Sequence, residues 1–423
     1  MRISTASYFQ TGLNSLNRQQ SELMHVFQQV SSGKRMITPA DDPLAAAQSL
    51  TLAQASSMNS RFAENRQVAV RNLGEEENVL MSLIPQVNGA KTRLLEAANG
   101  TLSNSDREAL ATVFEEMRDS IANLTNAQDA SGQYIFSGSQ GTVQPFSKNA
   151  DGSYTYVGDR YDRNVQVDQT RQLSSSDHGV DVFLRATPGS LVFLTAGHSA
   201  NSGTGEIGGV SIADSSKATQ VQSIDIAVTA GTTPDSPNLI ITTQVLNEAG
   251  ELEEVVKTVE YEADATTLDL GNGLTVALNG TPKAGDSFSL TNSQNQYGSD
   301  ELNLLNTLND VVNALRLDVD GNPANKATMQ NVLNRAMQHT DLAYDNILTI
   351  RASIGARMNE VEALSHVGSM QALHLSSEIS RIEDLDYYSA STQLEMRTSA
   401  LEAAAIAFKK IQSTNLFALN ARG

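Results

Sequence analysis

The sequence predicts a mainly α-helical protein that carries an inserted β-rich segment. Of the 28 glycines, 19 fall between positions 131 and 300. No proline follows Pro323, and none precedes Pro39. Long stretches with no proline and little glycine favour helices, whereas glycine-rich stretches favour turns between strands. We therefore expect helices towards both ends of the 423-residue chain and strands in its middle.

The first segment carries a heptad pattern. Eight positions between residues 6 and 30 are separated alternately by three and four residues, and seven of them are apolar. This spacing aligns the side chains in one narrow stripe, which is typical of a helix that packs against another helix. The eight positions are Ala6, Phe9, Leu13, Leu16, Gln20, Leu23, Phe27 and Val30.

A second apolar stripe lies near the other end of the sequence. Leu394, Leu401 and Phe408 are seven residues apart, and further apolar residues lie close to the same helical face. Either stripe alone could belong to an ordinary amphipathic helix on a local core. Because the two stripes flank a long middle segment, we expect the ends to pair with each other or with other chains. The predicted assembly seam comprises Phe9, Leu13, Leu16, Leu23, Phe27, Val30, Leu394, Leu401, Phe408, Ile411, Leu416 and Leu419.

Punctuation residues predict where the helices begin and end. Gly33 and Pro39 should end the first helix, and Pro43 can begin a second one with Asp41 or Asp42 as its N-cap. This second helix is expected to run into the nineties, with a possible kink at Pro85. A third helix should begin at residues 103–106, and the helical pattern resumes from about residue 300.

The middle of the chain contains two segments in which the helical spacing of apolar residues gives way to strand-like runs. Residues 133–185 contain the runs Tyr134–Phe136, Ser153–Val157 and Val165–Val167, which are typical of hairpins. Residues 191–297 contain no Arg, 3 Lys and 13 Asp or Glu, so this segment carries a charge of −10. It holds strand-like runs at 223–229, 239–245, 255–261 and 274–278. We expect a compact acidic β-domain here, inserted between two helical halves.

Composition excludes several classes of function. A net charge of −19 argues against a nucleic-acid partner and against a polybasic membrane anchor. The absence of cysteine excludes disulfides, thiolate metal sites and a thiol nucleophile. No stretch approaches the ~18–20 apolar residues of a membrane span. The first residues lack the apolar core of a cleavable signal, so any secretion is expected to use another route.

The motifs that suggest a nucleotide, calcium or other metal site do not meet the full pattern of such sites. Gly203–Gly208 matches GxGxxG, but the residues that follow are strand-like, so a turn is expected rather than a nucleotide site. Asp318–Asn322 resembles the start of a calcium loop, yet Pro323 and Met329 occupy the positions where that loop needs Gly and Glu. The six histidines show no ligand spacing and are expected on solvent-facing helices. We expect no enzymatic activity, no cofactor and no metal.

The two ends resemble the flagellin family of bacterial flagella. The N-terminal resemblance covers Leu13–Arg35, with Ser31-Ser32-Gly33-Lys34-Arg35 at its end, and then Ala40-Asp41-Asp42-Pro43. The C-terminal resemblance covers Arg351–Glu362 and the final stripe through Leu401-Glu402-Ala403. Together these regions span roughly residues 1–190 and 300–423, and the middle segment is the part that varies in such proteins.

Two features are more similar to the members that join hook to filament than to filament flagellin. Pro43 follows the double Asp, where flagellins usually continue with small residues. The segment Gly132–Ser139, followed by Pro145-Phe146, is similar to a signature of the junction members. The residues that carry the family resemblance are Ser31, Ser32, Gly33, Asp41, Asp42, Pro43, Tyr134, Ile135, Phe136, Ser137, Gly138, Arg351, Gly355 and Glu362.

The resemblance implies an architecture of three parts. Residues 1–40 with 386–423 would form a terminal coiled-coil assembly domain. Residues 41–190 with 298–385 would form a helical bundle with a β-hairpin. Residues 191–297 would form the acidic all-β domain, which projects outward.

The resemblance also implies a mechanical function outside the cell. The protein would be an adaptor layer in which copies of itself form a ring, between hook-associated protein 1 on the hook side and the flagellin filament. Before assembly it would meet an export chaperone and the gate of the flagellar type III export channel. Two alternatives stay open, namely a filament flagellin and a flagellar scaffold whose insertion binds surfaces as an adhesin does.

Overall fold

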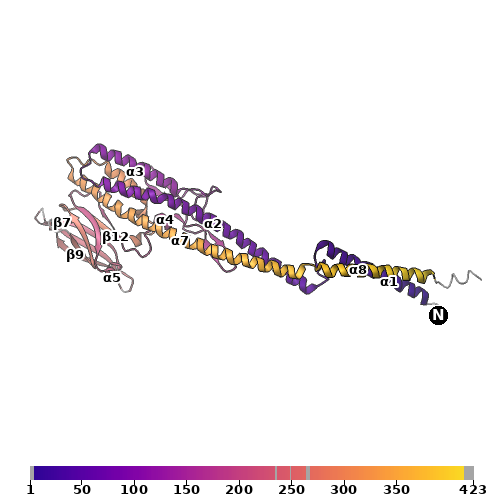
Figure 1. The fold of residues 1–423 in the computed structure, drawn as a ribbon. Coiled ribbons are helices and arrows are strands. Elements are labelled where there is room, and N and C mark those ends of the chain that lie inside the picture. Colours follow the sequence, from indigo (N-terminus) through magenta and orange to yellow (C-terminus); the bar gives the residue numbers. More distant parts are fainter. Residues whose placement is uncertain (1–3, 234–235, 248, 263–266, 414–423) are drawn as a thin grey trace, which may run out of the picture. The chain divides into compact units, whose positions relative to one another are not determined.

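The computed structural model describes residues 4–233, 236–247, 249–262 and 267–413 (Figure 1). The chain divides into two compact units, one of residues 1–64 with 363–423 and one of residues 65–362. Two long helices, α2 (Pro43–Ala97) and α7 (Pro323–Glu383), contribute residues to both units. The structure confirms a mainly helical fold with an inserted antiparallel β region. The finer division into three parts stays a prediction.

In the first unit, helices α1 (Ser4–Ser32) and α8 (Tyr387–Ser413) lie side by side (Figure 1). The ring centroids of Phe9 and Phe408 are 5.0 Å apart, and Arg397 forms an ion pair with Glu22. A Cβ atom on Gly12 would come within 3.1 Å of the Phe408 ring, so glycine lets the two helices approach closely here. The two ends of the chain therefore pair with each other, which was one of the two predicted arrangements.

A short turn connects α1 to α2 and is held against the end of α7. Gly33 has a φ of 71°, a conformation that favours glycine, and its N–H donates to Gln29 O at 2.9 Å. The N–H of Arg35 then donates to Glu383 O at 2.7 Å. Asp42 caps α2, because its Oδ1 accepts the N–H of Ala45 at 3.0 Å. The predicted helix boundaries are thus confirmed.

The helical core of the second unit is built from α2, α7 and two shorter helices. Helix α3 (Asn104–Thr125) begins with a capping box between Ser103 and Asp106, and α6 (Leu304–Leu315) follows the β region. Helix α2 continues without a break through Pro85. The apolar faces of these helices supply the core residues Leu73, Leu80, Leu83, Phe114, Ile121, Leu308, Val311, Leu333, Ile347 and Ile354.

Short strands and one helix of a single turn lie along this helical core. Strands β1 (Phe146–Lys148) and β2 (Tyr154–Tyr156) form one antiparallel hairpin, and β3 (Asn164–Gln166) and β4 (Gln172–Ser174) form another. Helix α4 (Gly179–Phe183) follows them. The hairpins predicted from residues 153–157 and 165–167 are therefore present.

The predicted strand at Tyr134–Phe136 is wrong. Tyr134 forms only an isolated bridge with Gln128, and Ile135 and Phe136 lie in a buried turn. The Phe136 ring packs edge-to-face on Phe183 with a centroid distance of 4.9 Å. These residues are aromatic and β-branched because they fill a core, and this composition cannot be told from that of a short strand by sequence alone.

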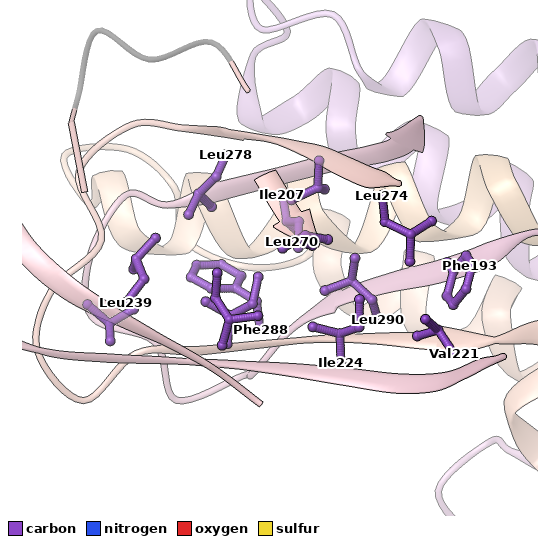
Figure 2. Packing of buried hydrophobic residues seen from close by; sticks show 14 of the residues in the cluster. Phe193, Ile207, Val221, Ile224, Leu239, Leu270, Leu274, Leu278, Phe288 and Leu290 are labelled. Atoms are coloured by element: carbon purple, nitrogen blue, oxygen red, sulfur yellow. The ribbon is translucent and has the colours of Figure 1, made fainter. Parts of the chain in front are cut away.

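The inserted segment is a sandwich of two antiparallel sheets. The larger sheet has the order β5-β12-β7-β8-β9, and the smaller has the order β10-β11-β6. Figure 2 shows the side chains that meet between them, including Ile224, Phe288 and Leu290. In β8, Leu239, Ile241 and Thr243 are buried at every second position, as expected for a strand with one face on a core.

The strands of the sandwich are β5 (Phe193–Gly197), β6 (Glu206–Ile212), β7 (Val221–Thr233), β8 (Ser236–Leu246), β9 (Leu252–Glu260), β10 (Leu268–Gly271), β11 (Leu274–Asn279) and β12 (Ser287–Asn292). One turn of helix, α5 (Ser215–Ala218), precedes β7. The GxGxxG match at 203–208 leads directly into β6, so it is part of the β-domain as predicted.

Two histidines depart from the expectation of solvent exposure. His339 is buried on α7 beside the Thr307 hydroxyl, and burial lowers its pKa to about 4. His178 is also buried, just before α4, where its Nδ1 accepts the N–H of Asp181 at 3.3 Å. Both side chains satisfy polar groups inside the second unit. A single sequence gives no spacing by which to distinguish such histidines from exposed ones.

We predict that Leu290→Ala will destabilise the sandwich by about 2–5 kcal/mol, the usual cost of a large cavity in a packed core. Leu290 lies in β12, a strand with neighbours on both sides, and its side chain is 0% exposed. The measurement is urea denaturation followed by tyrosine fluorescence, since the chain has no tryptophan. Val256→Ala on β9, where the side chain is 57% exposed, is the control and should change stability by less than about 0.5 kcal/mol. Equal effects of the two changes would contradict the packing described.

Candidate assembly surface

The paired helices α1 and α8 cover the predicted seam only in part. Phe9 and Phe27 remain exposed, the latter to 55%. Ile411 lies in α8, whereas Leu416 and Leu419 lie outside the described residues. The seam residues with half-buried side chains are Leu13, Leu16, Leu23, Val30, Leu394, Leu401 and Phe408. Two helices alone therefore leave apolar surface on each other uncovered.

The structure also places residues in the seam that the heptad pattern missed. Val26 is 4% exposed, and Ala390 on α8 is equally buried. Gln19, and not Gln20, turns towards the seam, and its buried Oε1 has no hydrogen-bond partner among the described residues. From Leu16 the 3-4 spacing also runs through residues 19, 23, 26 and 30. The polar residue at position 19 hid this alternative stripe.

Further large apolar side chains are exposed on the first unit. They are Met24, Leu44, Leu50, Met58, Val367, Met370, Leu373, Tyr387, Tyr388, Met396 and Ile406. A groove of about 510 Å³ is lined by Met36, Ile37, Pro39 and Leu50 beside the α1–α2 turn. These side chains leave apolar surface on the first unit that its own described residues do not cover.

The family-signature residues of the first unit shape the turn between α1 and α2. Hydrogen bonds from the N–H groups of Thr38 and Ile37, each 2.8 Å from Asp41 Oδ2, lower the pKa of Asp41 to about 2. His25 Nε2 lies 3.1 Å from the other oxygen of that carboxylate.

The neighbouring signature residues act in the same turn. Asp42 Oδ2 lies 3.3 Å from Arg35 Nη2, and Pro43 is the first residue of α2. Ser31 and Ser32 are exposed at the end of α1, where the Ser32 hydroxyl accepts the N–H of Lys34 at 3.3 Å. The signature here fixes the path of the chain as it leaves α1.

The signature segment Tyr134–Gly138 lies in the second unit and is held from both sides. Arg163 donates to Tyr134 O at 2.6 Å and to Gly138 O at 2.7 Å. Gly138 has a φ of 71°, and a Cβ atom there would collide with the Asp159 carboxylate. Ile135, Phe136 and Ser137 are buried. This segment therefore stabilises the second unit, and its interior residues offer no surface to a partner.

The remaining signature residues lie on α7. Arg351 Nε donates to Glu77 Oε1 on α2 at 2.9 Å, which ties the two long helices together. Gly355 is half-buried, and a Cβ atom added to it would meet nothing within 4 Å. Glu362 is exposed. These three residues belong to the second unit, so the structure does not group them with the seam.

Among residues 4–233, 236–247, 249–262 and 267–413, no three His, Asp or Glu side chains are grouped as a metal site would require. No helix in the same ranges combines the length and apolar character needed to cross a membrane.

Comparison with known protein families matches both ends of the chain. Residues 3–141 match the bacterial flagellin N-terminal helical region, and residues 337–419 match the bacterial flagellin C-terminal helical region. Together the two matches cover just over half of the chain.

Individual proteins extend this similarity into the middle segment. Flagellar hook-associated protein 3 of Escherichia coli K12 is 27% identical over 420 residues, which are 99% of this chain and 100% of that protein. The crystal structure of Xanthomonas campestris FlgL has a TM-score of 0.63 and 25% identity, over 78% of this chain and 99% of that one. The flagellar junction protein FlgL of Legionella pneumophila has a similar fold, with a TM-score of 0.59 and 23% identity, over 80% of this chain and 100% of that one. The chain therefore belongs to the flagellin family and groups within it with flagellar hook-associated protein 3.

Proposed function

We propose that this protein is a structural component of the bacterial flagellum that forms an adaptor layer at the hook–filament junction. The observation that carries this proposal is the similarity to flagellar hook-associated protein 3 along 99% of the chain. The partly covered seam of α1 and α8 supports it, because an adaptor needs apolar surface that only neighbours can bury. The role is mechanical, and no catalytic step is part of it.

The energetics of the terminal helices explain why assembly would complete them. Full burial of one Leu or Phe side chain is worth about 1.5–3 kcal/mol. Fixing one residue of a helix costs about 1–2 kcal/mol of backbone entropy. In the isolated chain the described seam residues are at most half-buried, so α1 and α8 gain only part of the burial free energy that opposes this entropy cost. Burial of Phe9, Phe27 and the outer apolar residues by neighbours would add the missing stabilisation.

The partners follow from the position in the flagellum. Hook-associated protein 1 would contact the layer from the hook side and flagellin from the filament side, while copies of this chain would complete a ring. Met24 on α1 and Met396 and Ile406 on α8 are exposed apolar residues that such neighbours could cover. Before assembly, the terminal helices would be bound by an export chaperone and would pass the gate of the type III export channel to reach the outside of the cell.

The three-part division fits the same function. The terminal part, residues 1–40 with 386–423, would form the assembly core, and residues 41–190 with 298–385 would surround it. The acidic part, residues 191–297, would project outward. A filament flagellin is the nearest alternative, and it would polymerise alone into long filaments when purified. We expect the purified protein not to do so.

We predict that Leu23→Asp will abolish assembly and leave the second unit folded. Leu23 is half-buried in the seam, and a charged side chain there cannot be transferred out of water without a partner. Motility and electron microscopy of flagella report assembly, and circular dichroism of the purified variant reports folding. Asn17→Asp adds the same charge at an exposed position of α1 and should leave assembly intact. Normal flagella in the Leu23→Asp strain would mean that the seam is not an assembly surface.

A strain without this protein should keep its hooks and release flagellin into the medium. The physical reason is that flagellin subunits would find no surface on the hook that is complementary to their own terminal helices. Electron microscopy of the cells and an immunoblot of the medium make the measurement, with the plasmid-borne gene as the control. Filaments of normal length on the deletion strain would contradict the junction role and favour the flagellin alternative.

A further inference from the structure

The β3–β4 hairpin and the loop after it are held against α2 and α7 by polar contacts. From α2, Arg66 donates to Val167 O at 2.9 Å. From α7, Glu360 accepts two hydrogen bonds from Arg171, at 2.6 and 2.9 Å. Also from α7, Arg357 donates to Ser174 O at 3.2 Å. All of these residues lie in the second unit. The segment 164–178 is thus docked against two long helices by side chains that reach its backbone and the Arg171 side chain.

A buried carboxyl group lies at the centre of this docked segment. Glu76 extends from α2, is 0% exposed, and accepts the N–H of Asp177 at 3.1 and 3.4 Å through its two oxygens. The carboxylate of Asp177 forms an ion pair with Arg357 of α7, and both of these side chains are largely buried. Two carboxyl groups therefore lie close to one guanidinium group in a largely buried cluster.

The charges of this cluster balance only when one carboxyl group holds a proton. With Glu76 protonated, the charges of Asp177 and Arg357 cancel, whereas ionised Glu76 leaves one uncompensated negative charge inside the unit. Burial, and then the charge of Asp177, raise the pKa of Glu76 well above the usual carboxyl range, although Arg357 and the Asp177 N–H oppose the shift.

The groups on the loop side of the cluster do not supply the missing positive charge to Glu76. Asp162 faces Asp177, and burial together with that neighbour raises the pKa of Asp162 as well. His178 Nε2 lies 3.5 Å from Asp181 Oδ2 and 4.0 Å from Asp162 Oδ1, so this ring faces those two carboxylates. Arg185 pairs with Asp181 at 3.0 Å.

We propose that residues 164–178 form a proton-operated clamp, which stays docked between α2 and α7 while Glu76 holds a proton and opens when Glu76 ionises. The docked state binds this proton more tightly than the open state, in which Glu76 meets water. Docking is therefore fully stable below the ordinary pKa of a carboxyl group and is lost as the pH rises through the elevated pKa of the docked state. The clamp does not depend on the proposed function, because all its parts lie within one unit of a single chain.

Hydrogen–deuterium exchange of the full-length protein between pH 6 and pH 9 tests the clamp. After correction for the intrinsic pH dependence of exchange, protection of residues 164–178 should fall by up to about tenfold per pH unit until the pH reaches the elevated pKa of docked Glu76, and should then level off. Protection of β12 in the sandwich should not change over the same range. Constant protection of residues 164–178 from pH 6 to pH 9 would overturn the proposal.

Two variants test whether Glu76, and not another titratable group, causes the loss of protection at high pH. Glu76→Gln keeps an oxygen that accepts the Asp177 N–H but cannot ionise, so protection of residues 164–178 should become independent of pH. Asp177→Asn leaves Arg357 free to pair with ionised Glu76 and should also suppress opening at high pH. Glu360→Gln is the matched control on α7, because it weakens an exposed contact of the clamp and should keep the wild-type pH dependence. A wild-type pH dependence in both Glu76→Gln and Asp177→Asn would show that another group drives the opening.

Discussion

The pairing of α1 with α8 is the contact on which the organisation of the first unit depends. It joins the two ends of the sequence, and the turn around Gly33 holds them in register. The N–H of Leu385 donates to Gly33 O at 3.0 Å, and Lys34 Nζ lies 3.0 Å from Glu383 Oε2. These contacts fix where α8 begins relative to where α1 ends. Yet two helices can bury only one face of each other, so the pair still leaves apolar residues on the outside.

The second unit covers its apolar faces with its own elements. The sandwich buries Ile224, Phe288 and Leu290 between two sheets, and the helical core buries residues such as Phe114 from several directions. Layers that cover each other's apolar faces can be stable alone, whereas a pair of helices with uncovered apolar faces is less stable. The chain thus combines one unit whose sandwich and helical core are buried by its own elements with one whose helical pair is only partly covered.

Sequence alone was sufficient for the fold class because its signals were local. Proline and glycine positions located the helix ends at Gly33 and Pro43, and alternating residues located the long strands. The failures came where packing decides. Tyr134–Phe136 has the composition of a strand but fills a core, and Gln19 breaks the hydrophobic pattern of a stripe to which it nevertheless belongs. His339 and Glu76 are buried by residues distant in sequence, and no spacing within their own helices reveals it.

The family-signature residues and the exposed apolar residues of α1 and α8 are different residues. Gly33 sets a backbone conformation, and Asp41 accepts backbone N–H groups. Gly138 leaves room for a neighbouring carboxylate, and Arg351 joins two helices. All four residues make their contacts within one chain. They therefore characterise the fold and say little about what the protein binds. Under the proposed function, specificity for a neighbour would come from exposed residues such as Phe27, Met396 and Ile406. Because a hydrophobic contact is not directional, the arrangement of these residues along α1 and α8, rather than any one of them, would select the neighbour.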